Sequence, residues 1–213
     1  MLTTPILYSY RRCPYAMRAR LALQHINRDY YLREIDLKNK PPQMLAVSPK
    51  GTVPVLCLNQ QTIDESLDIV SWAFSQKPES HISKEQQEEQ KKAIAGISKF
   101  VKPIYAFKYP ERYSQVEHEE SKIALSQYCQ QLDHHLSEHA AGWYYSEFSQ
   151  AEICLLPFIR QYIRAGATEF AKSGYHALAE WYQQRIESER FKAIMAKYPR
   201  WDGNNTILIK HNA

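Results

Sequence analysis

Hydrophobic positions in the first third of the chain switch between strand-like and helix-like spacing. Residues 5–10, PILYSY, form a short apolar and aromatic run, and 14–26 places its apolar residues near the helical period. Apolar and polar residues alternate along 29–37, and the pattern of 53–64 predicts two strands joined by a polar turn. Helical spacing returns along 65–74. The pattern predicts strand, helix, strand, loop, strand, strand and helix, in that order.

This order of elements is that of the thioredoxin fold, in which a helical crossover joins two parallel strands of a mixed sheet. We therefore predict an α/β thioredoxin-like domain with a mixed four-stranded sheet over residues 1–76. The polar segment 77–84 contains a proline and lacks periodicity, so we predict a linker there. Helical patterns follow along 85–213, which predicts an all-helical second domain that ends in an irregular tail.

One helix start in the second part carries a recognisable pattern. Ser149 and Glu152 stand at the spacing of a capping box, in which each side chain bonds the backbone N–H of the other residue. Phe148 and Ile153 are placed to form a hydrophobic staple across it. We expect a helix to begin at this point.

The composition is that of an ordinary globular protein, because 44% of the 213 residues are hydrophobic and 23% are charged. The N-terminus lacks the basic flank and apolar core of a signal peptide, and no apolar run reaches the ~18 residues of a membrane span. We therefore expect a cytoplasmic protein without a membrane partner. The net charge of +4 is small and gathered near the N-terminus, which argues against nucleic-acid binding.

The four cysteines are widely separated and include no CxxC pair, which argues against a disulfide framework and a thiol-rich zinc site. Cys57, Cys129 and Cys154 fall in predicted apolar strands or helices, where a free cysteine usually serves as a small buried hydrophobe. Cys13 instead lies in the turn before a predicted helix, and Pro14 suits the first helical position. Cys13 is therefore the candidate for chemistry.

At a helix N-cap, the sulfur of Cys13 would face the positive end of the helix dipole. Four arginines lie between residues 11 and 20, and they could either project from a solvated helix face or form an anion site around Cys13. A helix N-terminus and nearby arginine both lower a thiol pKa from ~8.5, so we expect a thiolate. Ala16 stands where a dithiol enzyme has its second cysteine, so the resolving thiol must come from outside the motif.

Histidines could in principle form a metal site in the second part of the chain. His134, His135 and His139 fall on one predicted helix, and the spacing of the last two would suit a metal pair. No neighbouring cysteine or HExxH context accompanies them. We therefore expect no metal and interpret these histidines as surface residues.

Four N-terminal motifs, CPYAMRARLAL, LKNKP, SPKGTVPVL and DESLDI, occur in the order and spacing of the N-terminal domain of cytosolic glutathione transferases. The chain resembles the omega-like, cysteine-active branch of that family, of bacterial type. The segment SQAEICLLPF resembles the helix start typical of the family's C-terminal domain, although Glu152 stands where aspartate is more common. The resemblance implies a homodimer that binds glutathione.

The resemblance also implies which residues bind glutathione. Lys40 would bind the glycyl carboxylate, and Val53 would pair its backbone with the cysteinyl unit. Pro54 would be the cis-proline of the family, a bond form that proline tolerates far better than other residues. Glu65 and Ser66 would hold the γ-glutamyl end at a helix start, where backbone N–H groups suit a carboxylate.

Around a second-substrate cleft the resemblance places aromatic residues of the helices and the tail, only some of which we expect to line it. They are Tyr105, Phe107, Tyr109, Tyr162 and Trp201. Tyr8 and Tyr10, at the end of the first predicted strand, could supply the hydroxyl that activates glutathione in tyrosine-type transferases, or could simply pack in the core.

The resemblance makes Cys13 the catalytic thiol of a glutathione-dependent thiol transferase or reductase that acts on small disulfides or dehydroascorbate-like acceptors. The thiolate would take glutathione from a mixed disulfide, and a second glutathione, as cosubstrate, would then release it. Two alternatives stay open: a conventional glutathione transferase that conjugates electrophiles, and a non-catalytic interaction protein that resembles the stringent starvation proteins.

Overall fold

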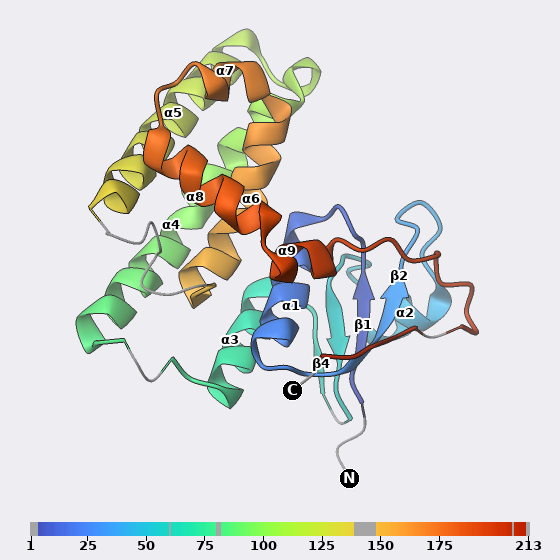
Figure 1. Cartoon of the computed structure of the whole chain (residues 1–213). Helices are drawn as coiled ribbons and strands as arrows, with labels where there is room; N and C mark the ends of the chain where they lie inside the picture. The colour runs from blue at the N-terminus through green and yellow to red at the C-terminus, as the bar shows by residue number, and fades with distance from the viewer. Residues whose placement is uncertain (1–3, 60, 80–81, 139–147, 206, 212–213) are drawn as a thin grey trace. The chain divides into compact units, whose positions relative to one another are not determined.

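The chain folds as two units, shown in Figure 1. The computed structural model describes residues 4–59, 61–79, 82–138, 148–205 and 207–211. The first unit combines the described residues up to 79 with those from 189 onward, and the second contains the residues between them. No described helix has the combined length and hydrophobicity that a membrane crossing requires.

The first unit is built on a mixed sheet. Its strands are β1 (Ile6–Ser9), β2 (Tyr30–Glu34), β3 (Val55–Cys57), β4 (Thr62–Ile63) and β5 (Ile207–Ile209), and its helices are α1 (Pro14–His25), α2 (Pro42–Val47), α3 (Ser66–Gln76) and α9 (Glu189–Ile194). The strand order is β4-β3-β1-β2-β5, with β1 parallel to β2 and the other neighbours antiparallel. The predicted thioredoxin-like fold with a mixed sheet is confirmed.

Alternation along β1 sends successive side chains to opposite faces of the sheet. Leu7 belongs to a buried cluster with Leu23 of α1 and Ile69 of α3, whereas Tyr8 belongs to a cluster with Met44 of α2. Helices α1 and α3 therefore cover one face and α2 the other, as Figure 1 shows. The turn that joins β1 to α1 consequently lies at the end of the sheet where β1 finishes.

The C-terminal end of the chain differs from the prediction. The sequence pattern assigns 85–213 to a helical domain and four strands to the sheet, whereas the residues from 189 onward join the first unit and β5 adds a fifth strand. Tyr31 of β2 lies opposite Leu208 of β5. Because backbone N–H and C=O groups at a sheet edge need partners, β5 satisfies groups that β2 would otherwise expose. A strand of three residues is too short for hydrophobic periodicity to reveal.

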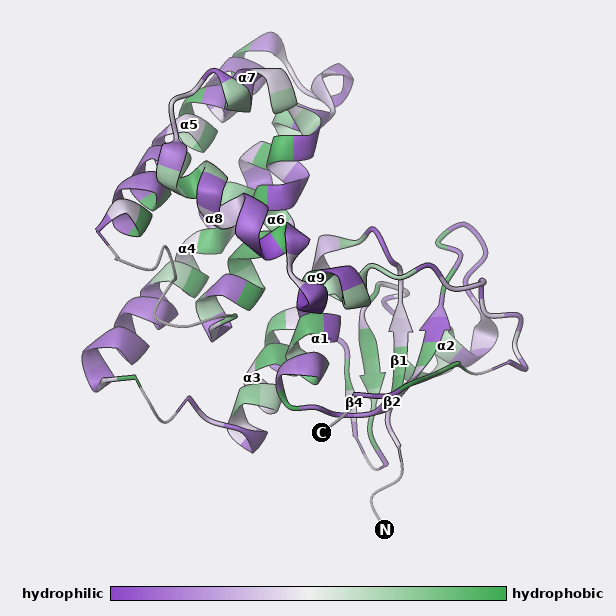
Figure 2. Ribbon diagram, in the orientation of Figure 1, coloured by the Kyte–Doolittle hydropathy of each residue, from purple (hydrophilic) through white to green (hydrophobic). Residues whose placement is uncertain are grey.

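The second unit is helical, as predicted for this part of the chain. It contains α4 (Lys84–Lys108), the 3₁₀ turn η1 (Pro110–Arg112), α5 (Gln115–Ser137), α6 (Gln150–Ala165), α7 (Ala167–Ala171) and α8 (His176–Glu187). Helix α4 packs against α5 and α6, and α5 packs against α8. Figure 2 shows hydrophilic residues at the start of α4 and along α5, whereas α6 is buried over most of its length. Helix α6 is therefore the centre of this unit.

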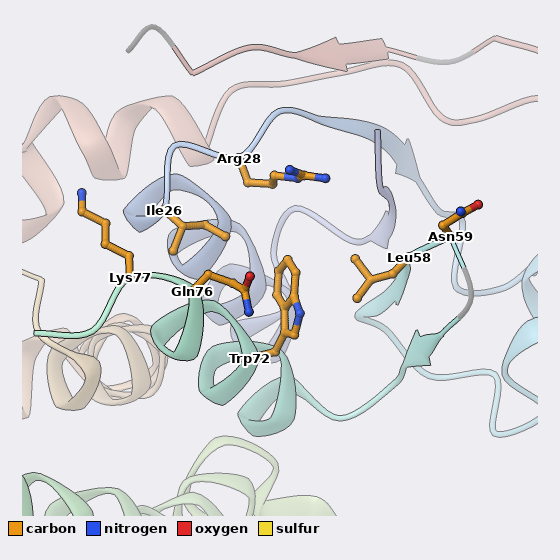
Figure 3. A pocket seen from close by; sticks show the side chains of 7 residues that line it. All are labelled: Ile26, Arg28, Leu58, Asn59, Trp72, Gln76 and Lys77. Carbon is orange, nitrogen blue, oxygen red and sulfur yellow. The ribbon is translucent and has the colours of Figure 1, made fainter. Parts of the chain in front are cut away.

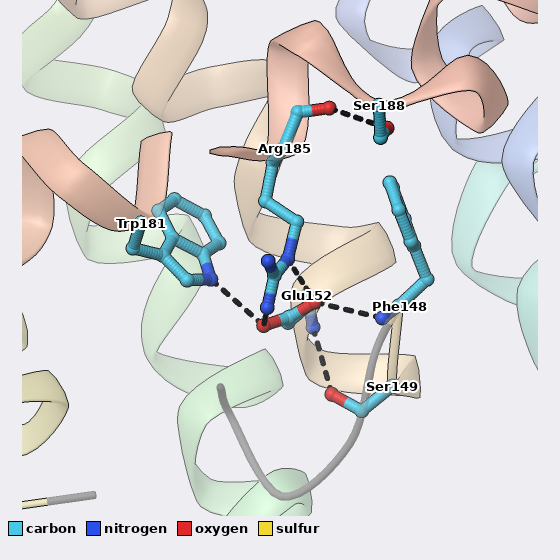
Figure 4. Close-up of polar contacts among 6 residues, drawn as sticks. All are labelled: Phe148, Ser149, Glu152, Trp181, Arg185 and Ser188. Atoms are coloured by element: carbon cyan, nitrogen blue, oxygen red, sulfur yellow. Dashed lines mark hydrogen bonds and ion pairs between the residues drawn. The ribbon is translucent and has the colours of Figure 1, made fainter. Parts of the chain in front are cut away.

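Glu152 lies at the centre of a buried polar network at the start of α6, shown in Figure 4. Its carboxylate accepts hydrogen bonds from the Phe148 backbone N–H at 2.8 Å and from the Trp181 indole N–H at 2.7 Å. The Arg185 guanidinium of α8 donates to both carboxylate oxygens, at 2.8 and 2.7 Å, and both side chains are 0% exposed. The Ser149 hydroxyl accepts the Glu152 N–H at 3.3 Å, which confirms the predicted helix start. The Glu152 carboxylate accepts the N–H of Phe148, whereas the predicted capping box has it accept the N–H of Ser149.

Candidate active site

A tight turn places Cys13 between the end of β1 and the start of α1. The Cys13 N–H donates to the Tyr10 carbonyl at 3.0 Å, and Cys13 is the N-cap residue of α1. Pro14 takes the first helical position, where its missing N–H leaves no donor unpaired. The predicted position of this cysteine at a helix start is confirmed.

The sulfur of Cys13 faces the segment that ends in Pro54. The thiol donates to the Val53 carbonyl oxygen, with 3.7 Å between the sulfur and the oxygen. The Val53–Pro54 peptide bond is cis, as the family resemblance predicts. The backbone of Val53 therefore forms part of the surroundings of the thiol.

A pocket of about 710 Å³ opens beside Cys13. The residues for which we predict a role in catalysis or glutathione binding all line it: Cys13, Lys40, Val53, Pro54, Glu65 and Ser66. Tyr15 and Asp64 also line the pocket and were not predicted, although each belongs to one of the quoted motifs, CPYAMRARLAL and DESLDI. The fold thus gathers four separate sequence motifs around one thiol.

The wall of this pocket carries charges of both signs. The Lys50 ammonium lies 3.2 Å from the Asp64 carboxylate and 2.7 Å from the Glu65 carboxylate, and the Ser48 hydroxyl donates to Asp64 at 3.0 Å. Lys50 is 52% exposed, so water screens these ion pairs and leaves them easy to rearrange. With Lys40 in the same wall, a ligand that carries carboxylate and ammonium groups finds partners for both.

Two of the arginines near Cys13 are buried. Arg18 and Arg20 are each 3% exposed, so their interpretation as part of a solvated helix face is wrong. Arg18 donates to the Ser66 hydroxyl at 3.4 Å, and Arg20 donates to the Ser9 hydroxyl at 2.8 Å. Both charges are therefore fixed inside the first unit and close to the pocket.

The protonation of Cys13 differs from the expectation. Burial raises the pKa of the Cys13 thiol above its ordinary value and outweighs the hydrogen bonds from the backbone N–H groups of Ala16 and Tyr15. The positive charges of Arg20 and Arg18 also lower this pKa, yet they do not overcome desolvation. The expectation of a thiolate in the free protein is therefore wrong, and the neutral thiol donates to Val53.

Comparison with known proteins finds a family that resembles the first part of the chain. Residues 7–81 match the family described as "Glutathione S-transferase, N-terminal domain". This part of the chain is therefore similar to that domain. Among curated proteins, "Probable glutathione S-transferase DHAR2, chloroplastic" of Oryza sativa subsp. japonica is 34% identical over 65 residues, which cover 30% of this chain and 24% of the relative. The match to this relative therefore spans about a quarter of its length.

Solved structures resemble nearly the whole chain. A glutathione S-transferase from the Antarctic clam Laternula elliptica aligns with a TM-score of 0.78 at 19% identity and covers 91% of this chain and 92% of its own. A glutathione transferase from Pseudomonas putida with glutathione disulfide bound aligns with a TM-score of 0.76 at 16% identity and covers 90% of each chain. The chain therefore has the glutathione S-transferase fold, with a thioredoxin-like domain and a helical domain.

Alkylation of Cys13 is expected to accelerate with pH. Only the thiolate reacts, and burial raises the pKa of the thiol, so below that pKa the rate should rise about tenfold per pH unit. The rate should level off above the ~8.5 of an ordinary cysteine. Intact-mass measurement of iodoacetamide adducts gives the rates, and Cys13→Ser identifies the modified site. A rate that is already constant at neutral pH would contradict this expectation.

Two of the other three cysteines are buried. Cys129 and Cys154 are 0% exposed, and burial raises the pKa of Cys129 to about 12, which confirms the prediction of small buried hydrophobes. Cys57 is only partly buried and packs against the cluster that contains Tyr8. The prediction of a buried residue is therefore only partly correct for Cys57.

The aromatic residues predicted for a second-substrate cleft have different environments. Tyr162 is a core residue instead, because it is 7% exposed and packs against Phe100 and Phe170, with ring centroids at 5.8 and 6.3 Å. Tyr105 and Tyr109 are half-buried and stack on one another at 6.5 Å. Helical spacing alone cannot distinguish Tyr162, which lies in the core, from Tyr105 and Tyr109, which are half-buried.

Trp201 and Tyr8 pack together on the sheet of the first unit. Their ring centroids lie 5.8 Å apart, and the Arg33 guanidinium lies 4.1 Å from the Trp201 ring. Trp201 is not among the residues that line the pocket beside Cys13. Arg33 also donates a hydrogen bond to the Tyr8 hydroxyl, and burial raises the pKa of this tyrosine. Core packing therefore describes Tyr8 better than activation of glutathione does.

A metal site finds no support among the residues that the structure describes. No three His, Cys, Asp or Glu side chains come together there in a way that could hold an ion. His134 is exposed on α5 and lies 3.6 Å from the Glu138 carboxylate. His139 lies outside the described residues.

A second pocket, of about 420 Å³, lies in the first unit and is shown in Figure 3. Trp72 and Gln76 of α3 line it together with Arg28, which follows α1, and Leu58, which follows β3. It contains no cysteine, so it offers no thiol chemistry. The pocket beside Cys13 is therefore the candidate active site.

Proposed function

We propose that this protein is a glutathione-dependent thiol transferase of the omega-like, cysteine-active type that acts through a mixed disulfide between Cys13 and glutathione. The observation that carries the proposal is the position of the Cys13 thiol in the wall of a pocket that also contains Lys40, Glu65 and Ser66. Glutathione carries two carboxylates, an ammonium group and a thiol. Each of these groups has a chemically suitable partner among those residues.

In the proposed complex, Lys40 pairs with the glycyl carboxylate and Glu65 with the ammonium group of the γ-glutamyl unit. The Ser66 end of α3 receives the γ-glutamyl carboxylate, because backbone N–H groups at a helix start favour an anion. Val53 pairs its backbone with the cysteinyl unit. Its carbonyl oxygen then accepts an N–H of glutathione in place of the Cys13 thiol, which lies 3.7 Å away in the free protein.

The reaction begins after the Cys13 thiol has lost its hydrogen bond to the Val53 carbonyl. The Cys13 thiol loses its proton to water, and the thiolate attacks the glutathione sulfur of a mixed disulfide. The bond between the two sulfurs of the substrate breaks, the released substrate thiolate takes up a proton, and a disulfide joins Cys13 to glutathione. A second glutathione thiolate attacks that disulfide, so Cys13 is regenerated and glutathione disulfide leaves. In the net reaction, the mixed disulfide and one free glutathione give the substrate thiol and glutathione disulfide, so the second glutathione is oxidised as the substrate sulfur is reduced.

Incubation with glutathione disulfide tests the proposal directly. The mass of the intact protein should rise by one glutathionyl group, and dithiothreitol should remove it. The matched Cys13→Ser variant should show no increase under the same conditions, although Cys57, Cys129 and Cys154 remain present. Equal labelling of the variant and the wild-type protein would overturn the proposal.

Removal of the Lys40 ammonium is expected to weaken glutathione binding. A charge-assisted hydrogen bond to a carboxylate contributes ~1.5–3 kcal/mol, so Lys40→Ala should raise the KM for glutathione at least about tenfold. The thiolate chemistry at Cys13 should persist, so kcat should change much less. Lys38→Ala is the control, because this exposed lysine does not line the pocket. Identical KM values for the two variants would exclude the assigned role of Lys40.

One observation favours a second candidate function. In the free protein the Cys13 thiol donates to the Val53 carbonyl oxygen at 3.7 Å, and burial raises the pKa of this thiol. A thiol can donate in the same way to the thiolate of bound glutathione. In that reading the protein conjugates glutathione to electrophiles, and no Cys13 adduct forms. Turnover of 1-chloro-2,4-dinitrobenzene without a glutathionyl adduct would favour conjugation over thiol transfer.

We also infer a homodimer from the family resemblance. Light scattering coupled to size-exclusion chromatography tests it, and a mass near 25.0 kDa for the particle in solution would mean a monomer.

A further inference from the structure

Two buried charged side chains hold the turn that carries Cys13. Arg20 of α1 is 3% exposed, and Glu34 at the end of β2 is 9% exposed. The Glu34 carboxylate accepts the Arg11 backbone N–H at 2.6 Å, and the Arg20 guanidinium donates to the Arg11 carbonyl at 2.7 Å. Arg11 lies in the turn from Tyr10 to Cys13. Because side chains from other elements bond both its N–H and its carbonyl, they hold this turn in place.

Arg20 also connects this turn to the end of the sheet. Its second terminal nitrogen donates to the hydroxyl of Ser9, the last residue of β1, at 2.8 Å. One guanidinium thus bonds the strand that precedes the turn and the turn itself. An apolar side chain of similar size would fill this space without the several kcal/mol needed to desolvate a charge. A buried arginine here therefore indicates a use for its charge.

The charge of Arg20 acts on the sulfur of Cys13. Arg20 and Cys13 stabilise each other's charged forms, and Glu34 likewise stabilises the charged form of Arg20. Water screens charges weakly in such a buried environment, so an interaction of this kind is stronger than the same one at the surface. Arg12 is adjacent to Cys13 in the sequence, yet its guanidinium is exposed and bonds the Tyr10 hydroxyl at 2.7 Å.

We propose that Arg20 and Glu34 are the positioning pair of the nucleophile: both hold the turn that presents Cys13, and Arg20 supplies a buried positive charge for the thiolate that forms during thiol transfer. Neither side chain lines the pocket, so neither is assigned to contact glutathione. The inference rests on the proposed function of Cys13. Glu34 contributes a negative charge that offsets part of the effect of Arg20.

The effects of other charged groups near the thiol must be distinguished from those of Arg20 and Glu34. Arg18 of α1 also lowers the pKa of Cys13, together with the N–H groups of the first helical turn. Across the pocket stand four further charged residues: Lys40, Lys50, Asp64 and Glu65. These residues stay unchanged in the test, so differences between the variants report on Arg20 and Glu34.

The test is the pH profile of Cys13 alkylation by iodoacetamide, a neutral reagent whose approach does not depend on local charge. Arg20→Gln should slow alkylation at neutral pH about tenfold and move the midpoint to higher pH, because a stabilising charge is lost. Arg20→Lys should restore the rate at neutral pH to within about threefold of the wild-type value, because the charge returns. Glu34→Gln should accelerate alkylation about threefold, because a negative charge is lost while an amide oxygen still accepts the Arg11 N–H.

Arg12→Gln is the matched control and should leave the profile unchanged, since solvent screens that guanidinium. A purely structural role predicts a different result: loss of either support would loosen the turn, expose the sulfur and accelerate alkylation in both variants. Acceleration by Arg20→Gln, or identical profiles for all variants, would overturn the proposal.

If Arg20→Gln does not fold, Glu34→Gln is the test, and slower or unchanged alkylation in that variant counts against the pair. Faster alkylation at neutral pH with the same limiting rate at high pH supports the pair, whereas a higher limiting rate means a loosened turn and counts against it. The assay contains no glutathione, so it also separates the two proposals. A profile that shifts as expected in a protein that forms no glutathione adduct would leave the positioning pair in place and refute the thiol-transferase function.

Discussion

A Glu152→Gln variant is expected to lose about 3–5 kcal/mol of unfolding free energy, because the substitution breaks a fully buried ion pair. The carboxylate accepts N–H groups from Phe148, Trp181 and Arg185 on its two oxygens. A glutamine amide offers only one oxygen, and its NH₂ group would face N–H donors. Unfolding in urea, followed by circular dichroism, measures the loss.

A surface ion pair provides the control for this prediction. Glu119 lies 2.9 Å from Lys122 on α5 and is 56% exposed, so Glu119→Gln should leave the unfolding free energy almost unchanged. The double variant Glu152→Leu with Arg185→Met should recover part of the loss, since an apolar pair carries no buried charge. A loss below about 1 kcal/mol for Glu152→Gln would mean that water or local movement compensates the broken pair.

A Cys13→Ser variant is expected to lose thiol-transferase activity by a factor of about a thousand or more. The serine oxygen keeps the position at the start of α1 but has a pKa far above that of a thiol, so almost no nucleophilic anion is available to attack a disulfide. Such a loss corresponds to ~4 kcal/mol of transition-state stabilisation. The rate of release of a thiol from a small glutathione mixed disulfide measures it.

Tyr8→Phe is the informative companion to that variant. Its hydroxyl is held by Arg33 within the buried face of the sheet, so its removal should lower activity by less than about threefold and act mainly on stability. The reverse result, with full activity in Cys13→Ser and none in Tyr8→Phe, would assign the chemistry to the tyrosine. Stability measurements on both variants show whether a loss of activity is caused by unfolding.

Local patterns explain which parts of the structure the sequence could predict. The helix start at Cys13 follows from Pro14 and from the change in hydrophobic period, both of which lie within a few residues. The cis bond before Pro54 and the helix that begins at Ser66 follow from motifs of similar length, read through the family resemblance. Such features depend on neighbours in the chain and therefore leave a signal in the sequence.

Features that depend on distant residues were not predicted. Helical spacing predicts that Arg20 is a surface residue. Only its contacts with Ser9 and Arg11 show why its charge is buried. The protonation of Cys13 follows the same rule, since its desolvation depends on how closely other segments cover the sulfur. Strand β5 is another case, because its partner β2 lies at the other end of the chain.

The position of β5 has a consequence for how the protein is made. A ribosome releases β1 to β4 first and the helices of the second unit next, so the last strand of the first sheet emerges after almost everything else. Until then the outer edge of β2 has unpaired backbone groups that can pair with another nascent chain. The first unit therefore begins to fold early in translation, but its sheet is completed only after the second unit has emerged.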